Sequence, residues 1–250
     1  MKSEFIKVID LILKVFDSLS FHKYSVQVSL RDKTDNSKYI GSNKLWEIAE
    51  NDILEAVKEK GINYNIEYGE AAFYGPKLDF MVKDSLNRKW QLGTIQVDYQ
   101  LPKRFNLEYT SETNERKTPV VIHRAPFGSL ERFVALLTEH CYGNFPFWVS
   151  PTQIIILSIS NKFNNYTNEI TTSLQSLGLR CKSDLRSEKI SKKISDSERK
   201  KIPYMIIIGE NEVKLKKLSL RKHGKGDLGL MDMNSLISIL QKEKNTLINN

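Results

Sequence analysis

Apolar residues recur at helical spacing over the first 19 residues of the chain. They occupy Phe5, Ile6, Ile9, Ile12, Val15, Phe16 and Leu19. Side chains three and four residues apart share one face of a helix, so this pattern predicts an amphipathic helix packed against a larger body. Alternating apolar positions over residues 24–30 predict a half-buried strand. A second helix is expected from an N-cap at Ser42 to a stop at Gly61.

The next part of the chain has the composition of strands. Residues 64–68, 78–83 and 89–99 are rich in β-branched and aromatic residues, and turn-forming residues separate them. This pattern predicts an antiparallel sheet. A further strand at 120–123 is expected to lead through a turn with Pro and Gly into a helix over residues 130–140.

A segment rich in aromatic and turn-forming residues, 143–151, interrupts this pattern. We expect a domain boundary there, with one domain at residues 1–148 and a second at 149–250. Beyond the boundary, strand-like and helix-like segments alternate, which favours a small α/β domain with a partly parallel sheet. The expected strands are 153–159, 179–182, 204–208 and 213–220. Three helices are expected: one that ends near residue 177, one over 188–201 and one over 233–244.

The composition is that of an ordinary globular protein, with 40% hydrophobic, 10% aromatic and 27% charged residues. These values exclude collagen-like, low-complexity and disulfide-scaffold proteins. The chain has no apolar run long enough to span a membrane and no signal-peptide pattern, so a cytoplasmic protein without a membrane partner is expected. Cys141 and Cys181 have no CxxC spacing and are interpreted as reduced thiols without a chemical role.

The net charge of +8 comes mostly from residues after 180. This asymmetry fits attraction to a polyanion such as RNA, and it equally fits a lysine-rich composition without a function. One basic run likewise has two interpretations: it could attract phosphates, or it could be a solvated face of a helix. This run consists of Lys189, Lys192, Lys193, Arg199, Lys200 and Lys201.

Three clusters in the first domain combine polar side chains with turn glycines. Residues 69–77 present Tyr74 and Lys77 on a turn bounded by glycines. Residues 90–98 place the amides of Gln91 and Gln96 within an expected central strand, where buried amides need partners such as a polar ligand. The third cluster, residues 122–133, is a strand, turn and helix whose glycine lets a ligand approach the backbone.

Together these clusters resemble the threonyl-tRNA synthetases, a family of class II aminoacyl-tRNA synthetases. Gly-Ser-Leu-Glu-Arg-Phe at 128–133 resembles the third class II motif, and Ala-Phe-Tyr-Gly-Pro-Lys and Trp-Gln-Leu-Gly-Thr-Ile-Gln resemble threonyl-specific segments. The resemblance implies an α/β (α+β) protein. Its parts would be the C-terminal part of a class II catalytic domain with an antiparallel sheet, then a small α/β anticodon-binding domain.

The resemblance also implies roles for individual residues. Arg132 would lie over the adenine and reach the triphosphate of ATP, a role suited to a planar cation. Lys77 would neutralise carboxylate or phosphate charge near the adenylate, and Gln91 would lie on the nucleotide side. The threonine pocket would be lined by Tyr74, Gln96 and Ser129.

His123 matches a histidine that ligates a catalytic zinc ion in the family. Open positions on that ion bind the amino and hydroxyl groups of threonine, which allows valine to be rejected. The two other zinc ligands, a cysteine and a histidine, are expected upstream of this chain, and Mg²⁺ is expected with ATP. The remaining histidines, interpreted as surface or packing residues, are His22, His140 and His223.

In the second domain, Glu212 and Arg221 match positions that contact anticodon bases in the family, where a carboxylate and a guanidinium can read base edges. Ser187 stands where the bacterial pattern often has asparagine, which predicts a weaker or altered contact there.

The implied activity is that of a threonine–tRNA ligase, which activates threonine with ATP and transfers it to tRNA(Thr). The first two class II motifs are not in this chain, so we expect a second polypeptide to supply them, an exposed apolar surface on residues 1–148, and a homodimer of the complete enzyme. The alternatives are a non-catalytic RNA-binding paralogue and a truncated remnant.

Overall fold

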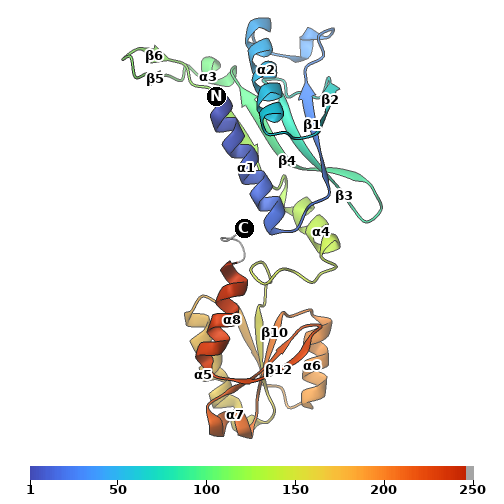
Figure 1. Cartoon of the computed structure of the whole chain (residues 1–250), viewed down its shortest axis with the longest axis vertical. Coiled ribbons are helices and arrows are strands. Elements are labelled where there is room, and N and C mark those ends of the chain that lie inside the picture. The colour runs from blue at the N-terminus through green and yellow to red at the C-terminus, as the bar shows by residue number, and fades with distance from the viewer. Residues whose placement is uncertain (246–250) are drawn as a thin grey trace. The chain divides into compact units, whose positions relative to one another are not determined.

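The computed structural model describes residues 1–245. The chain divides into two compact units, Met1–His140 (unit 1) and Cys141–Asn250 (unit 2). Each unit contains its own five-stranded sheet, in the order β2-β1-β3-β4-β7 in unit 1 and β12-β11-β10-β8-β9 in unit 2 (Figure 1).

Unit 1 contains all the helices and strands that the sequence predicts for it. Its helices are α1 (Lys2–Ser18), η1 (Asn36–Lys38), α2 (Asn43–Glu59), α3 (Leu101–Arg104) and α4 (Leu130–His140). Its strands are β1 (Tyr24–Leu30), β2 (Tyr64–Tyr68), β3 (Lys77–Lys83), β4 (Lys89–Asp98), β5 (Tyr109–Thr110), β6 (Arg116–Lys117) and β7 (Val121–Ala125).

Local chemistry explains where α2 begins and ends. The Ser42 hydroxyl accepts a hydrogen bond from the backbone N–H of Leu45 at 3.4 Å, which satisfies one of the free N–H groups of the first turn. Gly61 follows the helix with a φ of +64°, a conformation that favours glycine. Both expected boundaries of this helix are confirmed.

The pairing of β2 differs from the expectation of a purely antiparallel sheet. β2 lies at the edge and pairs with β1 in parallel, whereas β1, β3, β4 and β7 pair antiparallel. The reason is that α2 connects β1 to β2. This helix carries the chain back along the sheet, so that β2 runs in the same direction as β1.

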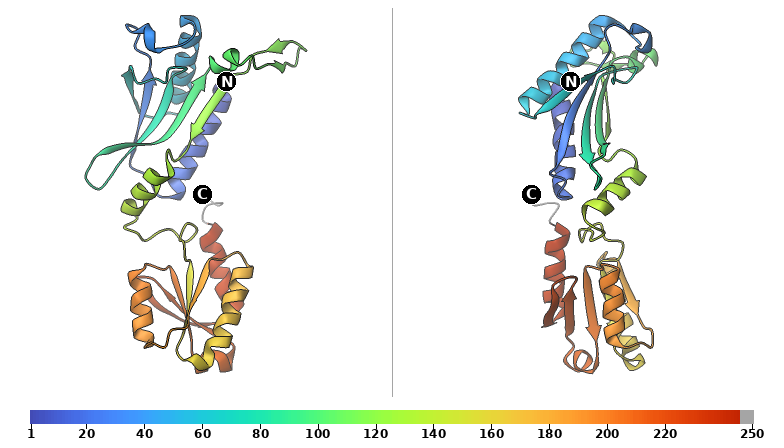
Figure 2. Two further views of the ribbon diagram at one scale, coloured as in Figure 1. Left: turned by 180° about the vertical axis from the view of Figure 1, so that it is seen from behind. Right: turned by 90° about the vertical axis from the view of Figure 1, so that its right-hand side faces the viewer.

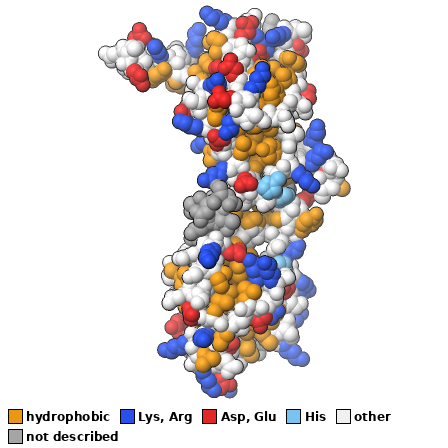
Figure 3. Space-filling model, viewed as in Figure 1, with side chains coloured by type: hydrophobic (Ala, Val, Ile, Leu, Met, Phe, Trp, Pro, Cys, Tyr) orange, Lys and Arg blue, Asp and Glu red, His pale blue; other side chains and the backbone are white. Residues whose placement is uncertain are grey.

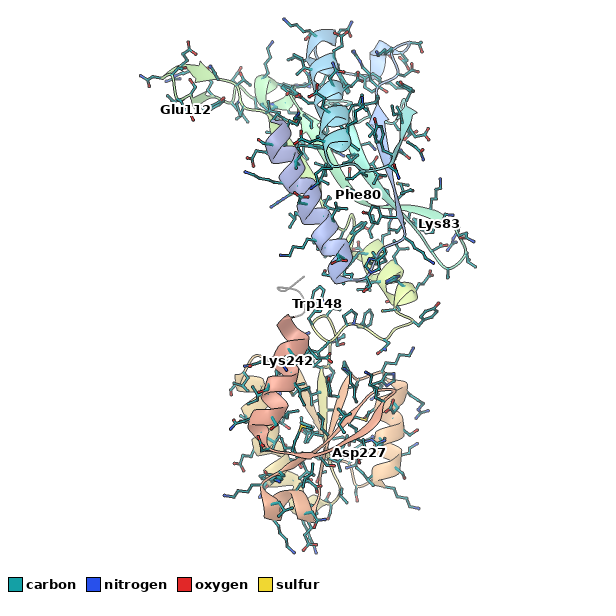
Figure 4. All side chains as sticks on the ribbon, viewed as in Figure 1. Phe80, Lys83, Glu112, Trp148, Asp227 and Lys242 are labelled. Carbon is teal, nitrogen blue, oxygen red and sulfur yellow. The ribbon has the colours of Figure 1, made fainter. Side chains whose placement is uncertain are left out.

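One face of the unit 1 sheet is apolar and the other is polar. Helices α1 and α2 cover the apolar face (Figure 2). Phe80 of β3 is fully buried between this face and α1, with its ring centroid 5.6 Å from that of Phe16 (Figure 4). Because side chains alternate along each strand, the burial of one face under two helices leaves polar side chains on the other.

Unit 2 is a small α/β domain. Its helices are η2 (Asn161–Phe163), α5 (Asn164–Ser176), α6 (Ile190–Arg199), α7 (Glu210–Leu215) and α8 (Met233–Asn245). Its strands are β8 (Ile154–Ser158), β9 (Cys181–Asp184), β10 (Tyr204–Ile208), β11 (Leu218–Lys222) and β12 (Gly226–Met231). β8 pairs in parallel with β9 and β10, and β11 is antiparallel to its neighbours, so the expected partly parallel sheet is confirmed.

Helices cover both faces of this sheet, with α5 and α8 on one side and α6 on the other (Figure 1). The core joins strand residues such as Ile156 and Ile206 to Leu174 of α5 and Leu236 of α8, and all four are fully buried. Burial of this much apolar surface is the main stabilising contribution to the unit.

The expected strand over residues 213–220 is wrong in its first half. Residues 210–215 form α7, and only Leu218–Lys222 forms β11. The apolar alternation changes phase across the lysine pair at 216–217, and Leu215 is 59% exposed. Acidic residues in the first turn favour the helix.

Several short elements, including η1, are not expected from the sequence. Others are α3, the β5–β6 hairpin and β12. Glu112 lies at the tip of the hairpin, which projects from unit 1 (Figure 4). Of the helices within residues 1–245, none is long and apolar enough to cross a membrane.

Candidate functional site

Three polar side chains lie in a row across the polar face of the unit 1 sheet. The register places Lys77 of β3 opposite Gln96 of β4, and Gln96 opposite His123 of β7. Directly opposed residues of antiparallel strands project from the same face. An amine, an amide and an imidazole therefore lie side by side. Ser29 of β1 extends the row because it lies opposite Lys77.

Tyr74 closes one end of this row from the loop before β3. Its hydroxyl donates a hydrogen bond to Oε1 of Gln96, and its ring centroid lies 5.2 Å from that of His123. Burial, with a smaller contribution from the charge of Asp98, raises the pKa of the phenol. Gly75 allows the loop to approach β4, because a Cβ at this position would lie 1.8 Å from the carbonyl oxygen of Val97.

The imidazole of His123 is held by a buried carboxylate. Nε2 of His123 lies 2.9 Å from Oδ2 of Asp98, a residue with 0% exposure. The other oxygen, Oδ1, accepts the backbone N–H groups of Gln100 and Leu101 at 2.8 and 2.9 Å. The Asp98 carboxylate is therefore fixed on both sides.

A second buried carboxylate, Asp79, lies near the centre of the polar face with 1% exposure. Its Oδ2 accepts from Ser29 Oγ at 2.9 Å and lies 3.3 Å from Lys77 Nζ. Its Oδ1 accepts from Gln91 Nε2 and Thr94 Oγ1, each at 2.7 Å. Asp79 thus orients two predicted site residues, Lys77 and Gln91, at once.

Arg132 lies at the far end of β4 from this row. Its guanidinium donates to the carbonyl oxygen of Gln91 at 2.8 Å and lies 5.3 Å from the ring centroid of Trp90. The indole N–H of Trp90 donates to Asp84 at 2.9 Å. This bond, more than those from Arg88, lowers the pKa of Asp84 to about 2 against the opposing effect of burial. Arg132 and Trp90 also line a cavity of about 180 Å³.

Ser129 lies on the turn between β7 and α4 and acts as a cap for that helix. Its hydroxyl accepts from the backbone N–H of Arg132 at 3.3 Å. The turn depends on Gly128, which has a φ of +65° and where a Cβ would lie 2.6 Å from the carbonyl oxygen of Leu92. The structure therefore brings together Tyr74, Lys77, Gln96 and His123, and Asp79 links Gln91 to Lys77. Ser129 and Arg132 lie together at the start of α4, where Arg132 contacts the backbone of Gln91.

His123 fits one position of a zinc site. A histidine whose second ring nitrogen bonds a carboxylate is the usual form of a metal-ligating imidazole. Within residues 1–245, no group of three His, Cys, Asp or Glu side chains could hold a metal ion by itself. A zinc ion held by His123 would therefore need further ligands from outside the described residues.

The predicted anticodon residues of unit 2 lie at separate places. Glu212 follows the carboxyl end of β10, and its Oε2 accepts the backbone N–H of Gly209 at 2.9 Å. Arg221 lies on β11 opposite Met205, near the amino end of β10. Ser187 lines a polar pocket of about 420 Å³ that includes Ser160 and follows the carboxyl ends of β8 and β9.

The basic run over α6 and its flanking residues is not a uniform solvated face. Lys193 has 1% exposure, and its ammonium donates to the carbonyl oxygens of Ser158 and Asp184 at 2.7 and 3.0 Å. The interpretation of Lys193 as a phosphate-attracting residue is therefore wrong, and burial lowers its pKa. On the face shown in Figure 3, Lys and Arg side chains of both units are interspersed with Asp and Glu.

The sequence interpretation missed the two carboxylates that orient the site, Asp79 and Asp98. Each interrupts or ends an apolar strand, and a charged residue on a buried strand needs partners. That signal was present in the sequence. It could not show which side chains the carboxylates contact, because the pairing of strands was unknown.

Each of the two units matches a known protein family. Residues 1–141 match the family model "tRNA synthetase class II core domain (G, H, P, S and T)". Residues 153–243 match the model "Anticodon binding domain". Among solved structures, the RNA binding domain of threonyl-tRNA synthetase from Cryptosporidium parvum has a TM-score of 0.87 at 36% identity, over 97% of this chain and 60% of that one.

Curated relatives carry one common name. A threonine–tRNA ligase of Cytophaga hutchinsonii is 57% identical over 97% of this chain, and one of Porphyromonas gingivalis is 53% identical over 99% of it. The chain spans 38% of the length of each of these relatives. It therefore belongs to the class II tRNA synthetase family, as a core segment joined to an anticodon-binding domain that corresponds to the C-terminal part of threonine–tRNA ligases.

Proposed function

We propose that this chain is the C-terminal part of a threonine–tRNA ligase, which activates threonine with ATP and transfers it to tRNA(Thr). The observation that carries the proposal is the row of Lys77, Gln96 and His123, closed at one end by Tyr74. This row offers charge, hydrogen bonds and an imidazole to a small polar ligand. The similarity to proteins named threonine–tRNA ligase supports threonine as that ligand.

In the activation step, an oxygen of the threonine carboxylate attacks the α-phosphorus of ATP. The bond to pyrophosphate breaks, and threonyl-adenylate forms. Arg132 and Lys77 would act as the catalytic residues by opposing the negative charge at the phosphates. Arg132 already lies over Trp90, so the guanidinium would present its other face to the adenine, with Gln91 on the same nucleotide side.

Threonine would be held by Tyr74, Gln96 and Ser129, with His123 as one zinc ligand. When bound, zinc would offer coordination positions to the amino and hydroxyl groups of threonine, and magnesium would accompany the ATP phosphates. The hydrogen bond from Tyr74 to Gln96 and the contact between Tyr74 and His123 support a shared pocket.

Unit 2 would recognise the anticodon of tRNA(Thr). Glu212 and Arg221 would contact bases, and the polar pocket that includes Ser187 is wide enough for an unstacked nucleotide group. Lys189 and Lys192, unlike Lys193, are free to attract phosphates because both are exposed.

Residues outside this chain would complete the catalytic site. A partner polypeptide would carry the first two class II motifs and the remaining zinc ligands, and the complete enzyme would be a homodimer. Exposed apolar side chains on unit 1, such as Leu130 and Val134 of α4, support a covering polypeptide there.

The proposal is tested by threonine-dependent exchange of pyrophosphate into ATP. The chain is joined to the N-terminal part of a related threonine–tRNA ligase, and wild type is compared with Arg132→Ala. We expect Arg132→Ala to lower the exchange rate by about 100-fold or more, because a charge-stabilising group is lost.

Arg116→Ala is the matched control, because Arg116 is exposed on the β5–β6 hairpin. It should leave the rate within about twofold of wild type. Binding of tRNA without exchange in any combination would favour the alternative of a non-catalytic RNA-binding protein.

A further inference from the structure

The hydrogen bonds of Asp98 determine which nitrogen of His123 can accept a metal ion. An ionised carboxylate only accepts hydrogen bonds. Oδ1 of Asp98 is occupied by two backbone N–H groups, which leaves Oδ2 for the imidazole at 2.9 Å. Nε2 of His123 must therefore carry the proton in this contact. In the neutral ring, Nδ1 is then the unprotonated nitrogen.

We propose that Asp98 is a positioning residue that holds His123 as the Nε2–H tautomer and so presents Nδ1 as the metal-binding atom. Neither the family comparison nor the sequence pattern assigns a role to Asp98. The inference rests on the proposed function for the identity of the metal ion. The tautomer itself is a property of this chain and is measurable without catalysis.

Two features make this orientation rigid. Asp98 is fully buried at the end of β4, and its bonds to the N–H groups of Gln100 and Leu101 tie it to the start of α3. The ring of Tyr74 also lies beside His123, with the two ring centroids 5.2 Å apart. Rotation of the imidazole would break the bond to Asp98 and leave a buried carboxylate oxygen unpaired.

The first test is the histidine tautomer in the wild-type chain. The 250-residue chain is labelled with ¹⁵N at histidine, and long-range ¹H–¹⁵N spectra are recorded at pH 8, where histidine is ordinarily neutral. The signals of His123 are assigned by their loss in His123→Gln. We expect a protonated Nε2 and an unprotonated Nδ1. A dominant Nδ1–H tautomer, or an even mixture, would overturn the proposal.

The second test replaces the Asp98 carboxylate by an amide, which keeps one oxygen that can accept the hydrogen bonds from the start of α3. In Asp98→Asn, the side-chain oxygen can still accept the N–H groups of Gln100 and Leu101, but the amide nitrogen can donate to His123. We expect the Nδ1–H tautomer to rise to at least half of the population. Asp227→Asn, an exposed surface change, should leave the tautomer unchanged.

When zinc ions alone are added to the wild-type chain, the ¹⁵N chemical shift of Nδ1 of His123 should change more than that of Nε2. A larger shift of Nε2, or an unchanged tautomer in a folded Asp98→Asn chain, contradicts the proposal. A different result would refute the proposed function. If His123→Ala retained full threonylation in the joined enzyme, the zinc role would be wrong while the tautomer result stood.

Discussion

Three aspartates in unit 1 each gather several hydrogen-bond donors. Asp79 orients Lys77 and Gln91, Asp84 orients Trp90 beneath Arg132, and Asp98 orients His123. All three carboxylates are buried. Asp79 and Asp98 contact residues placed in the proposed site, whereas Asp84 contacts Trp90, which lies against Arg132. At the residue scale, the positions of the proposed catalytic side chains therefore depend on acidic residues that need not touch substrate.

Removal of the Asp79 carboxylate should affect stability and activity together. Asp79→Ala leaves the donors of Ser29, Gln91 and Thr94 without their acceptor, at a cost of about 3 kcal/mol in the free energy of unfolding. Urea unfolding measures this change. Glu112→Ala, at the exposed hairpin tip, should change the free energy by less than about 0.5 kcal/mol. Equal effects of the two variants would contradict the account of Asp79.

Asp84 should make unit 1 sensitive to acid. Its folded-state pKa of about 2 lies below the usual value near 3.9, so its contribution to stability is complete above about pH 4 and is lost as the pH falls through about 2. Asp84→Asn should therefore be less stable than wild type at pH 6, and the difference should shrink below pH 4. Urea unfolding between pH 2 and 6 tests this, with Asp227→Asn as the surface control. A difference that stayed constant down to pH 2 would argue against it.

At the scale of elements, the turn between β7 and α4 positions Ser129 and Arg132. This turn passes close to the backbone of β4, and Gly128 permits the approach. The loop before β3 uses Gly75 in the same way. The proposed site is thus assembled where two loops contact β4.

Gly128→Ala should destabilise unit 1 by about 2 kcal/mol or more, because its Cβ would meet the carbonyl oxygen of Leu92 at 2.6 Å. Gly224→Ala is a matched control. Its φ of +67° is similar, but a Cβ there would have nothing within 4 Å. The difference between the two variants, measured by urea unfolding, isolates the steric contact from the backbone strain. Equal losses would show that the contact with β4 is unimportant.

A buried lysine in α6 connects that helix to the unit 2 sheet. Lys193→Met removes the bonds to the carbonyl oxygens of Ser158 and Asp184 and should cost about 1–3 kcal/mol in the free energy of unfolding. The adjacent, exposed Lys192→Met should cost less than about 0.5 kcal/mol. If tRNA is bound, only the Lys192 change should reduce the salt dependence of binding. The reverse assignment of the two effects would overturn this interpretation of α6.

The elements that the sequence predicted well have strong local signals. The strand β1 and the helix α2 show clear periodicity, and Ser42 caps the helix as expected. The strand predicted over 213–220 is half wrong because the end of α7 and the start of β11 each place two apolar residues two positions apart, as a strand does. The parallel pairing of β2 depends on contacts distant in sequence. For the same reason, the row of Lys77, Gln96 and His123 could be proposed only by resemblance, until the register of β3, β4 and β7 was known.

At the scale of the whole molecule, two units with separate sheets and cores should fold independently of each other. Residues 141–250 contain a complete sheet with helices on both faces. Expressed alone, they should unfold in one cooperative transition and bind tRNA(Thr) with an affinity that falls as salt rises. A non-cooperative transition measured by circular dichroism would contradict this view of unit 2.

We expect this chain to supply half of a threonine-specific catalytic site. The most direct measurement is threonylation of tRNA(Thr) by the chain joined to the N-terminal part of a related ligase. We expect activity in the joined wild type, a loss of at least about 100-fold in His123→Ala, and activity near wild type in the exposed control His22→Ala. Equal activity of the two histidine variants, or no threonylation by the joined wild type, would contradict it.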